Sequence, residues 1–231
     1  MDPLDGTTAT AKGRANAVSV IALAPKGHLF ATKNYYMEKL AVGPKAKGSI
    51  DLNKPLSQNL INVAKALDKK IEDLTVTVLE RDRHKDIIAQ CRKLGCRIRM
   101  FSDGDVGAAI ATCFEDSGVD ILAGIGGAPE GVLAAAALKC LGGEMQARLY
   151  AHTSEEIQNA KENPSYYDIL TTDDLAKGDD ILFIATGVSD GDLLKGVRFM
   201  SNHKVLTDTV VMRSASGTVR FIKAIHDMQK K

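Results

Sequence analysis

The chain begins with two carboxylates and a hydroxyl whose spacing suits metal chemistry, in the stretch DPLDGT at residues 2–7. The proline restricts φ and the glycine permits a sharp turn, so a loop here would hold Asp2 and Asp5 on one side. Hard oxygen ligands of this kind suit Mg²⁺ or Mn²⁺, and the Thr7 hydroxyl would orient a metal-bound water. The alternative is an Asx-type turn with solvated carboxylates, which the spacing alone favours.

A glycine-rich stretch, GIGGAPEG at residues 124–131, stands where a strand pattern becomes a helix pattern. Glycines at such a junction let a phosphate approach backbone amides, and Pro129 suits a first helical turn. The third glycine is displaced from its place in the dinucleotide-binding motif, and Glu130 would repel a phosphate unless a cation lay between them. The stretch therefore favours metal-assisted phosphate chemistry, and a purely structural turn is the equally open alternative.

The tetrapeptide Ser102-Asp103-Gly104-Asp105 closes a predicted parallel strand, at the carboxyl end where open α/β sheets bind ligands. Paired aspartates there would accept hydrogen bonds from sugar hydroxyls. The equally open alternative is that Asp105 caps the helix that follows. The same four letters recur at residues 189–192, so the tetrapeptide alone is not specific.

The tripeptide Arg81-Asp82-Arg83 closes the preceding predicted strand. Two guanidiniums there suit a phosphate held by bidentate contacts, whereas a solvated loop is the default expectation. Each pattern is ambiguous by itself. Because all of them stand at the carboxyl ends of successive strands, their joint placement favours one sugar-phosphate site.

The predicted strands and helices that must position these residues follow one pattern before about residue 67 and another after it. The apolar run 17–24 ends at the turn signal Pro25-Lys26-Gly27, and residues 28–32 are predicted to be its antiparallel partner strand. Asp51 is predicted to open a helix, because apolar residues recur at helical spacing from Leu56 to Leu67.

From Leu74 onward, strand and helix patterns alternate with short connections, which is typical of parallel βαβ units. The polar stretch 159–177 is predicted to be a surface excursion. The predicted strands are 75–79, 97–101, 120–125, 148–150, 181–185, 207–212 and 218–224, and the predicted helices are 83–94, 106–114 and 128–141.

The composition excludes several classes of protein. The 231 residues are 45% hydrophobic and 26% charged, with a net charge of +1, so nothing favours a nucleic-acid or membrane surface. The absence of tryptophan leaves few platforms for stacking bases, and the longest apolar runs fall short of the roughly 20 residues of a membrane span. The four cysteines form no CxxC pair and read as reduced thiols. These features are typical of a cytoplasmic α/β protein.

The DPLDGT stretch resembles the DPxDGT metal motif of the lithium-sensitive phosphatase superfamily. Longer stretches resemble class II fructose-1,6-bisphosphatases, and the resemblance runs nearly from end to end. It implies a layered α-β-α-β-α sandwich with an antiparallel sheet lobe and a mixed sheet lobe. Residues 1–66 would be the remainder of the antiparallel lobe with the metal motif, and 67–231 the α/β lobe with the sugar-phosphate site. The stretches that carry the resemblance are 36–44, 102–106, 124–131, 138–145 and 185–191.

The resemblance also implies an activity and a set of site residues. Members are phosphatases that need Mn²⁺ or Mg²⁺ and remove the 1-phosphate of fructose 1,6-bisphosphate in gluconeogenesis. Asp5 and Thr7 would be catalytic, with Thr7 positioning the attacking water. Some members have Lys-Pro-Arg where this chain has Arg81-Asp82-Arg83. The implied metal ligands are Asp2, Asp5 and Glu130, and the implied substrate contacts are Asp5, Gly6, Thr7, Tyr36, Arg81, Asp82, Arg83, Asp103, Gly104, Asp105 and Gly127.

Family members carry a segment before DPxDGT that supplies an aspartate and a glutamate to the metal site, whereas Met1 alone precedes Asp2 here. We therefore expect a fragment or a truncated gene product with impaired turnover. One alternative is a non-catalytic sugar-phosphate binding protein. Another is a related phosphatase acting on sedoheptulose 1,7-bisphosphate or inositol phosphates. The expected partners are a small sugar bisphosphate and further copies of the chain, and neither nucleic acid nor a membrane.

Overall fold

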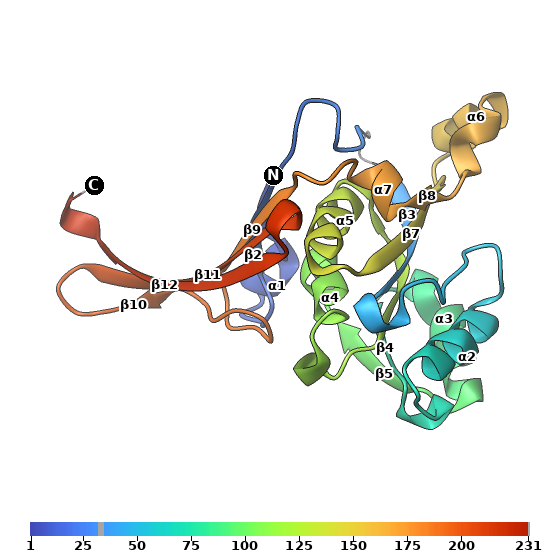
Figure 1. Cartoon of the computed structure of the whole chain (residues 1–231), viewed down its shortest axis with the longest axis horizontal. Coiled ribbons are helices and arrows are strands. Elements are labelled where there is room, and N and C mark those ends of the chain that lie inside the picture. The colour runs from blue at the N-terminus through green and yellow to red at the C-terminus, as the bar shows by residue number, and fades with distance from the viewer. Residues whose placement is uncertain (32–34, 231) are drawn as a thin grey trace.

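Residues from the two ends of the chain combine into one antiparallel sheet (Figure 1). The computed structural model describes residues 1–31 and 35–230. Strands pair in the order β1-β2-β9-β11, and both β10 and β12 pair with β11. The strands are β1 (Asp2–Asp5), β2 (Val18–Leu23), β9 (Leu182–Gly187), β10 (Arg198–Phe199), β11 (Lys204–Arg213) and β12 (Thr218–Asp227).

The second sheet is mixed, in the order β5-β4-β6-β3-β7-β8. Its three strands from the predicted βαβ region are neighbours and run parallel, which confirms that prediction. The other three pair antiparallel. The strands are β3 (Tyr36–Val42), β4 (Thr75–Leu79), β5 (Arg97–Phe101), β6 (Ile121–Gly127), β7 (Glu144–Tyr150) and β8 (Leu170–Thr171).

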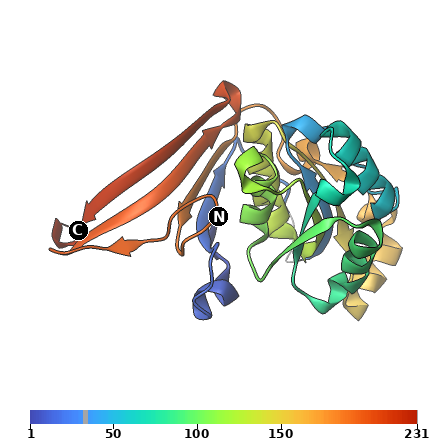
Figure 2. The ribbon, with the colours of Figure 1, turned by 90° about the horizontal axis from the view of Figure 1, so that it is seen from below.

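Helices fill the space between the sheets and cover the far face of the mixed sheet (Figure 2). Helices α4 and α5 lie between the sheets, and α2 and α3 lie on the opposite face of the mixed sheet. The predicted helix 106–114 is shorter than expected, because it ends at Ala111. The helices are α1 (Thr7–Ala11), α2 (Leu56–Ala66), α3 (Lys85–Leu94), α4 (Asp105–Ala111), α5 (Ala128–Leu141), α6 (Ser154–Glu162) and α7 (Thr172–Leu175).

The layers follow from two apolar cores. One lies between the sheets, where Val20 and Phe183 of the antiparallel sheet join Met37 of the mixed sheet around α5. That helix is rich in alanine, and ten of its fourteen residues are buried, so both sheets approach it closely. The other core joins Leu60 of α2 to Val76 of β4. The structure is thus α/β, with one antiparallel and one mixed sheet.

The division of the chain at residue 66 stays a prediction. The antiparallel sheet draws on residues 2–23 and 182–227, whereas β3 lies before residue 66 and belongs to the mixed sheet. The boundary therefore does not separate the two sheets. Among the described helices, none is long and apolar enough to cross a membrane.

Two predictions on either side of β2 are wrong. Residues 2–5 form a strand paired with β2 instead of a loop. Residues 28–31 do not pair with β2, because β1 and β9 occupy its two edges, and residue 32 lies outside the described residues. Instead, Phe30 N donates to Leu175 O at 2.9 Å. Leu175 is fully buried, so the stretch 159–177 is not wholly a surface excursion.

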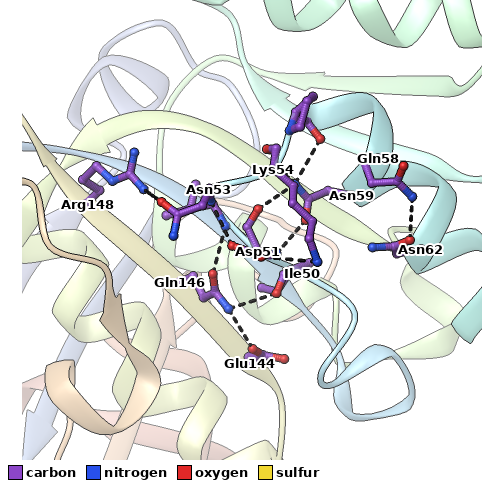
Figure 3. Close-up of polar contacts among 12 residues, drawn as sticks. Ile50, Asp51, Asn53, Lys54, Gln58, Asn59, Asn62, Glu144, Gln146 and Arg148 are labelled. Carbon is purple, nitrogen blue, oxygen red and sulfur yellow. Dashed lines mark hydrogen bonds and ion pairs between the residues drawn. The ribbon is translucent and has the colours of Figure 1, made fainter.

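The predicted start of a helix at Asp51 is also wrong, because α2 begins at Leu56. Figure 3 shows the cause, a turn held by the amide of Asn59. Asn59 Oδ1 accepts from Asp51 N at 2.6 Å, and its Nδ2 donates to three carbonyl oxygens, of Asp51, Lys54 and Pro55. Because this side chain provides partners for the backbone groups of the turn, residues 51–55 need no helical hydrogen bonds.

The buried Asn59 amide gives a testable prediction for stability. We expect Asn59→Leu to lower the free energy of unfolding by about 3 kcal/mol, because it leaves several backbone groups without partners. Urea denaturation followed by circular dichroism measures the change. Asn62→Leu on the same helix is the control, since Asn62 bonds only to the exposed Gln58 among the described residues. Equal losses in the two variants would contradict the role given to Asn59.

Candidate active site

Two glycine turns from distant parts of the chain exchange hydrogen bonds. Gly6 (φ 102°) precedes α1 and Gly104 (φ 88°) precedes α4, both in the left-handed region. Asp5 Oδ2 accepts from Val106 N at 3.2 Å, in the first turn of α4. Asp103 Oδ2 accepts from Thr8 N at 2.7 Å, in the first turn of α1. Neither helix has a side-chain acceptor of its own at the N-terminus. Asp5, which lies just before α1, supplies one to α4, and Asp103, which lies just before α4, supplies one to α1.

This exchange bears on the structural alternatives for both motifs, and the metal and sugar roles stay predictions. Asp105 does not cap α4 with its side chain, because Asp5 supplies an acceptor there. The Asx-type turn is present at Asp2, where Leu4 N donates to Asp2 Oδ1 at 2.9 Å. Asp5, however, is buried and not solvated. Thr7 is exposed at the start of α1.

Asp5 lies in an electrostatic environment that disfavours its charge. Burial is the largest cause, followed by the negative charges of Asp105, Asp2 and Glu130, and together they raise the pKa of Asp5 to about 8. The hydrogen bond from Val106 N opposes this shift. A cation nearby would favour the ionised form of Asp5.

The glycines of the turn at residues 126–127 make room for two carboxylates. A Cβ at Gly126 would collide with Asp105 Oδ2, and one at Gly127 would collide with Glu130 Oε2. Glu130 Oε2 is buried and has no hydrogen-bond partner among the described residues. The two glycines therefore let acidic groups approach the backbone here, and the choice between a phosphate site and a purely structural turn stays open.

Lys39 on β3 is a functional candidate that the sequence reasoning missed. Its ammonium group is 2% exposed and donates to Asp105 Oδ2 at 2.6 Å and to Gly127 O at 2.7 Å. It ties the Asp103–Asp105 turn to the turn that carries Glu130. Lys39 shares one face of its strand with Met37 and Ala41, and a charge on that otherwise apolar face was the signal that could have found it.

The two predicted phosphate arginines bridge to the strands on either side of β4. Arg81 Nη1 donates to Ser102 O at 2.8 Å, after β5. Arg83 donates through Nε and Nη2 to Ile125 O of β6, at 2.9 and 2.7 Å. Asp82 is placed differently, because its exposed carboxylate pairs with Lys85 at 2.9 Å. The order β5-β4-β6 thus directs both guanidiniums toward the edge where the acidic turns lie.

Tyr36 lies beside Arg83, which agrees with its predicted place near the basic pair. The guanidinium carbon of Arg83 is 4.9 Å from the centre of the Tyr36 ring. The ring of His152 stacks on Tyr36 with centroids 4.5 Å apart, and His152 was not predicted. Its Nδ1 lies 2.9 Å from Glu156 Oε2, on α6.

The donor chemistry of Asp2, Asp5 and Glu130 fits a divalent cation. All three offer hard carboxylate oxygens, Glu130 Oε2 is buried without a partner among the described residues, and the pKa of Asp5 is raised. Across residues 1–31 and 35–230, however, no group of three or more His, Cys, Asp or Glu side chains stands ready to hold an ion. The metal assignment therefore stays a prediction.

Comparison with known proteins decides the family. The family described as bacterial fructose-1,6-bisphosphatase, glpX-encoded, matches residues 1–226. The chain belongs to this family. Fructose-1,6-bisphosphatase 1 class 2 of Escherichia coli K12 is 44% identical over 246 aligned positions, which cover 100% of this chain and 73% of that protein. The class 2 enzymes of E. coli O6:H1 and Shigella flexneri match to the same extent. The family resemblance inferred from the motifs is confirmed.

His84 is a further residue of this glpX-type chain that the sequence reasoning missed. It is buried beside the arginine pair, where Nδ1 bonds to Leu79 O and Nε2 accepts from Ile125 N, both at 2.7 Å. Gly124 leaves room for the ring. The imidazole therefore holds the end of β4 against β6, and it must be neutral to accept from Ile125.

The buried imidazole predicts a loss of stability in acid. Burial, above all, lowers the pKa of His84 from its ordinary value of 6.5. Its contribution is therefore complete above pH 6.5 and is lost as pH falls through the lower folded-state pKa. We expect the urea midpoint of the native chain to fall relative to that of His84→Phe as pH is lowered from 7.5 to 5. The comparison is needed because both proteins share Asp5, whose raised pKa favours the folded state as pH falls. An equal change in the two midpoints would contradict this assignment.

Proposed function

We propose that this chain is a divalent-metal phosphatase that removes the 1-phosphate of fructose 1,6-bisphosphate, giving fructose 6-phosphate and phosphate. The observation that carries the proposal is the meeting of the Asp5–Thr7 and Asp103–Asp105 turns in a member of the fructose-1,6-bisphosphatase family. A sugar phosphate at this meeting point would contact acids on one side and the arginine pair on the other.

The proposed substrate contacts divide by charge. Arg81, Arg83 and Tyr36 would bind the distal phosphate, since both guanidiniums are already held in place by carbonyl oxygens. Asp103 and Asp105 would accept hydrogen bonds from the sugar hydroxyls, beside the Gly104 and Gly127 backbone. The bond from Lys39 fixes the orientation of the Asp105 carboxylate.

The scissile phosphate would lie at the opposite end, at Asp5, Gly6 and Thr7, with Asp2, Asp5 and Glu130 as ligands of Mn²⁺ or Mg²⁺. When bound, such a cation neutralises phosphate oxygens and lowers the pKa of a bound water. The exposed hydroxyl of Thr7 would position the attacking water. Asp5 is buried near the carboxylates of Asp2 and Glu130.

We further propose that the chain works in the cytoplasm in gluconeogenesis, as a homo-oligomer with the layered α-β-α-β-α arrangement of the lithium-sensitive phosphatases. Exposed apolar residues on the outer face of the antiparallel sheet support the proposal that a further layer or a second subunit covers it. Leu23 and Ile222 lie on that face and are 47% and 42% exposed, whereas the inner face carries the buried Val20 and Met212.

The absence of a ready-made group of three metal-binding side chains across the described ranges favours a second candidate, a sugar-phosphate binding protein without turnover. Phosphate release from fructose 1,6-bisphosphate, with Mn²⁺, with Mg²⁺ and with a chelator, separates the two. The phosphatase proposal expects release that needs the metal and exceeds release from sedoheptulose 1,7-bisphosphate and inositol phosphates. Tight binding of fructose 1,6-bisphosphate without release would overturn it in favour of the binding protein.

The Glu130 carboxylate gives a test of the metal site that does not depend on turnover. We expect Glu130→Gln to weaken Mn²⁺ binding by about tenfold or more, because it removes a negative ligand. The electron paramagnetic resonance signal of free Mn²⁺ measures the binding. Glu162→Gln, an exposed change on α6, is the matched control and should bind Mn²⁺ like the native chain. Unchanged binding in Glu130→Gln would remove this residue from the metal site.

Loss of a phosphate arginine should affect the substrate and leave the metal site intact. We expect Arg83→Ala to raise KM, and the Kd for fructose 1,6-bisphosphate, by about tenfold, because a charge-assisted contact is lost. Mn²⁺ binding should not change. Arg92→Ala removes the same charge from an exposed position on α3 and serves as the control. A tenfold change in both variants would indicate a general charge effect instead.

A further inference from the structure

A cavity of about 420 Å³ lies beside the proposed active site, and most of its lining residues have no part in the proposed phosphatase reaction. It lies between the two sheets, bounded by β5, α4, β12 and the loop at residues 191–194. Asp103 and Gly104 form the wall that it shares with the proposed site. Its volume falls within the range of small-molecule pockets, about 300–1,000 Å³.

The walls of the cavity are aromatic. Phe101, Phe114 and Phe221 line it, which is half of the six phenylalanines of the chain. The rings of Phe114 and Phe221 meet edge to face, with centroids 6.4 Å apart. Leu193 and Leu194 complete the apolar surface. A flat apolar ring is the kind of group that such walls accept.

The charged groups of the cavity are mostly acidic. Asp103, Asp116 and Asp192 line it, and Arg99 is the one cation among its described lining residues. Arg99 is already engaged, because its Nη2 lies 2.5 Å from Asp192 Oδ2 and its Nη1 donates to Ser117 O at 3.0 Å. The same contact engages Asp192. Asp103 accepts from Thr8 N and pairs with Arg81 at 3.7 Å, so Asp116 is the lining carboxylate without a partner among the described residues. With three carboxylates to one guanidinium, the lining is negative overall and favours a ligand that brings positive charge or N–H donors.

The second copy of the tetrapeptide at residues 189–192 builds one wall. Asp192 N donates to Asn16 Oδ1 at 2.9 Å, and Asn16 Nδ2 donates back to Asp192 Oδ2 at 3.2 Å. A Cβ at Gly191 would lie 2.6 Å from Asn16 Oδ1, so only glycine permits this approach. The loop is thereby held against the N-terminal segment, with Asp192 at the cavity.

We infer that this cavity is a binding site for an aromatic amine, a planar ring that carries a protonated nitrogen. The ring packs among the phenylalanines, and the nitrogen meets the aspartates. The site shares Asp103 and Gly104 with the proposed phosphatase site, whereas Tyr36, Arg81, Arg83 and Glu130 do not line it.

The experiment compares two indole probes of opposite charge, tryptamine and indole-3-acetate, in fluorescence titrations of the full chain. The chain has no tryptophan, so selective excitation of indole reports the probe. We expect tryptamine to bind at least about tenfold more tightly than indole-3-acetate, which corresponds to about 1.4 kcal/mol. Equal binding of both probes, or tighter binding of the anion, would overturn the proposal.

Substitution at Gly107 places the probe within the cavity. Gly107 lies on α4 and lines the cavity, and a Cβ there would meet no atom within 4 Å. We expect Gly107→Leu to fill the space and weaken tryptamine binding by about tenfold or more. Gln58→Leu on the exposed face of α2 is the matched control and should bind tryptamine like the native chain.

Phe221→Ala is a second test, because Phe221 is 56% exposed on the outermost strand of its sheet and its loss spares the core. It should also weaken tryptamine binding. Native affinity in either folded variant would overturn the proposal. These measurements need neither metal nor sugar phosphate, so they stand or fall separately from the proposed phosphatase activity.

Discussion

The exchange of hydrogen bonds between Asp5 and Val106, and between Asp103 and Thr8, is the constraint on which the proposed site depends. It joins residues about a hundred positions apart, from different sheets, through the first turns of two helices. The same exchange ties the N-terminal strand to α4. The neighbouring aromatic cavity has the turn at Asp103 and Gly104 as one of its walls.

The acids at this junction cost free energy that their surroundings only partly offset. Asp105 has the buried ammonium of Lys39 as its partner, whereas Asp5 is left among carboxylates and its pKa rises to about 8. Burial among like charges is expensive for an acid, so the raised pKa of Asp5 and the partnerless Oε2 of Glu130 support a ligand that brings positive charge. That reasoning from Asp5 and Glu130 supports the proposed cation more strongly than the motif spacing did.

The middle layer explains how such a junction can form. Helix α5 is almost entirely buried between the sheets, and its alanines allow strands from both ends of the chain to pack on it. Its first turn carries Glu130 beside Gly127, and β3 brings Lys39 to the same place. Replacing one of these alanines by a larger residue would therefore move the acidic turns apart as well as disturb the core.

Local pattern alone determined the parallel strands β4, β5 and β6, the helices between them and the family, because apolar periodicity and long motifs are encoded within short segments. It also named the aspartates and arginines that the structure brings together. Tertiary structure decided what depended on distant partners, namely the strand at residues 2–5, the turn that Asn59 holds, and the roles of Lys39 and His84. A lysine or histidine becomes a structural bridge only when the fold excludes water and leaves one acceptor within reach, and no local pattern contains that information.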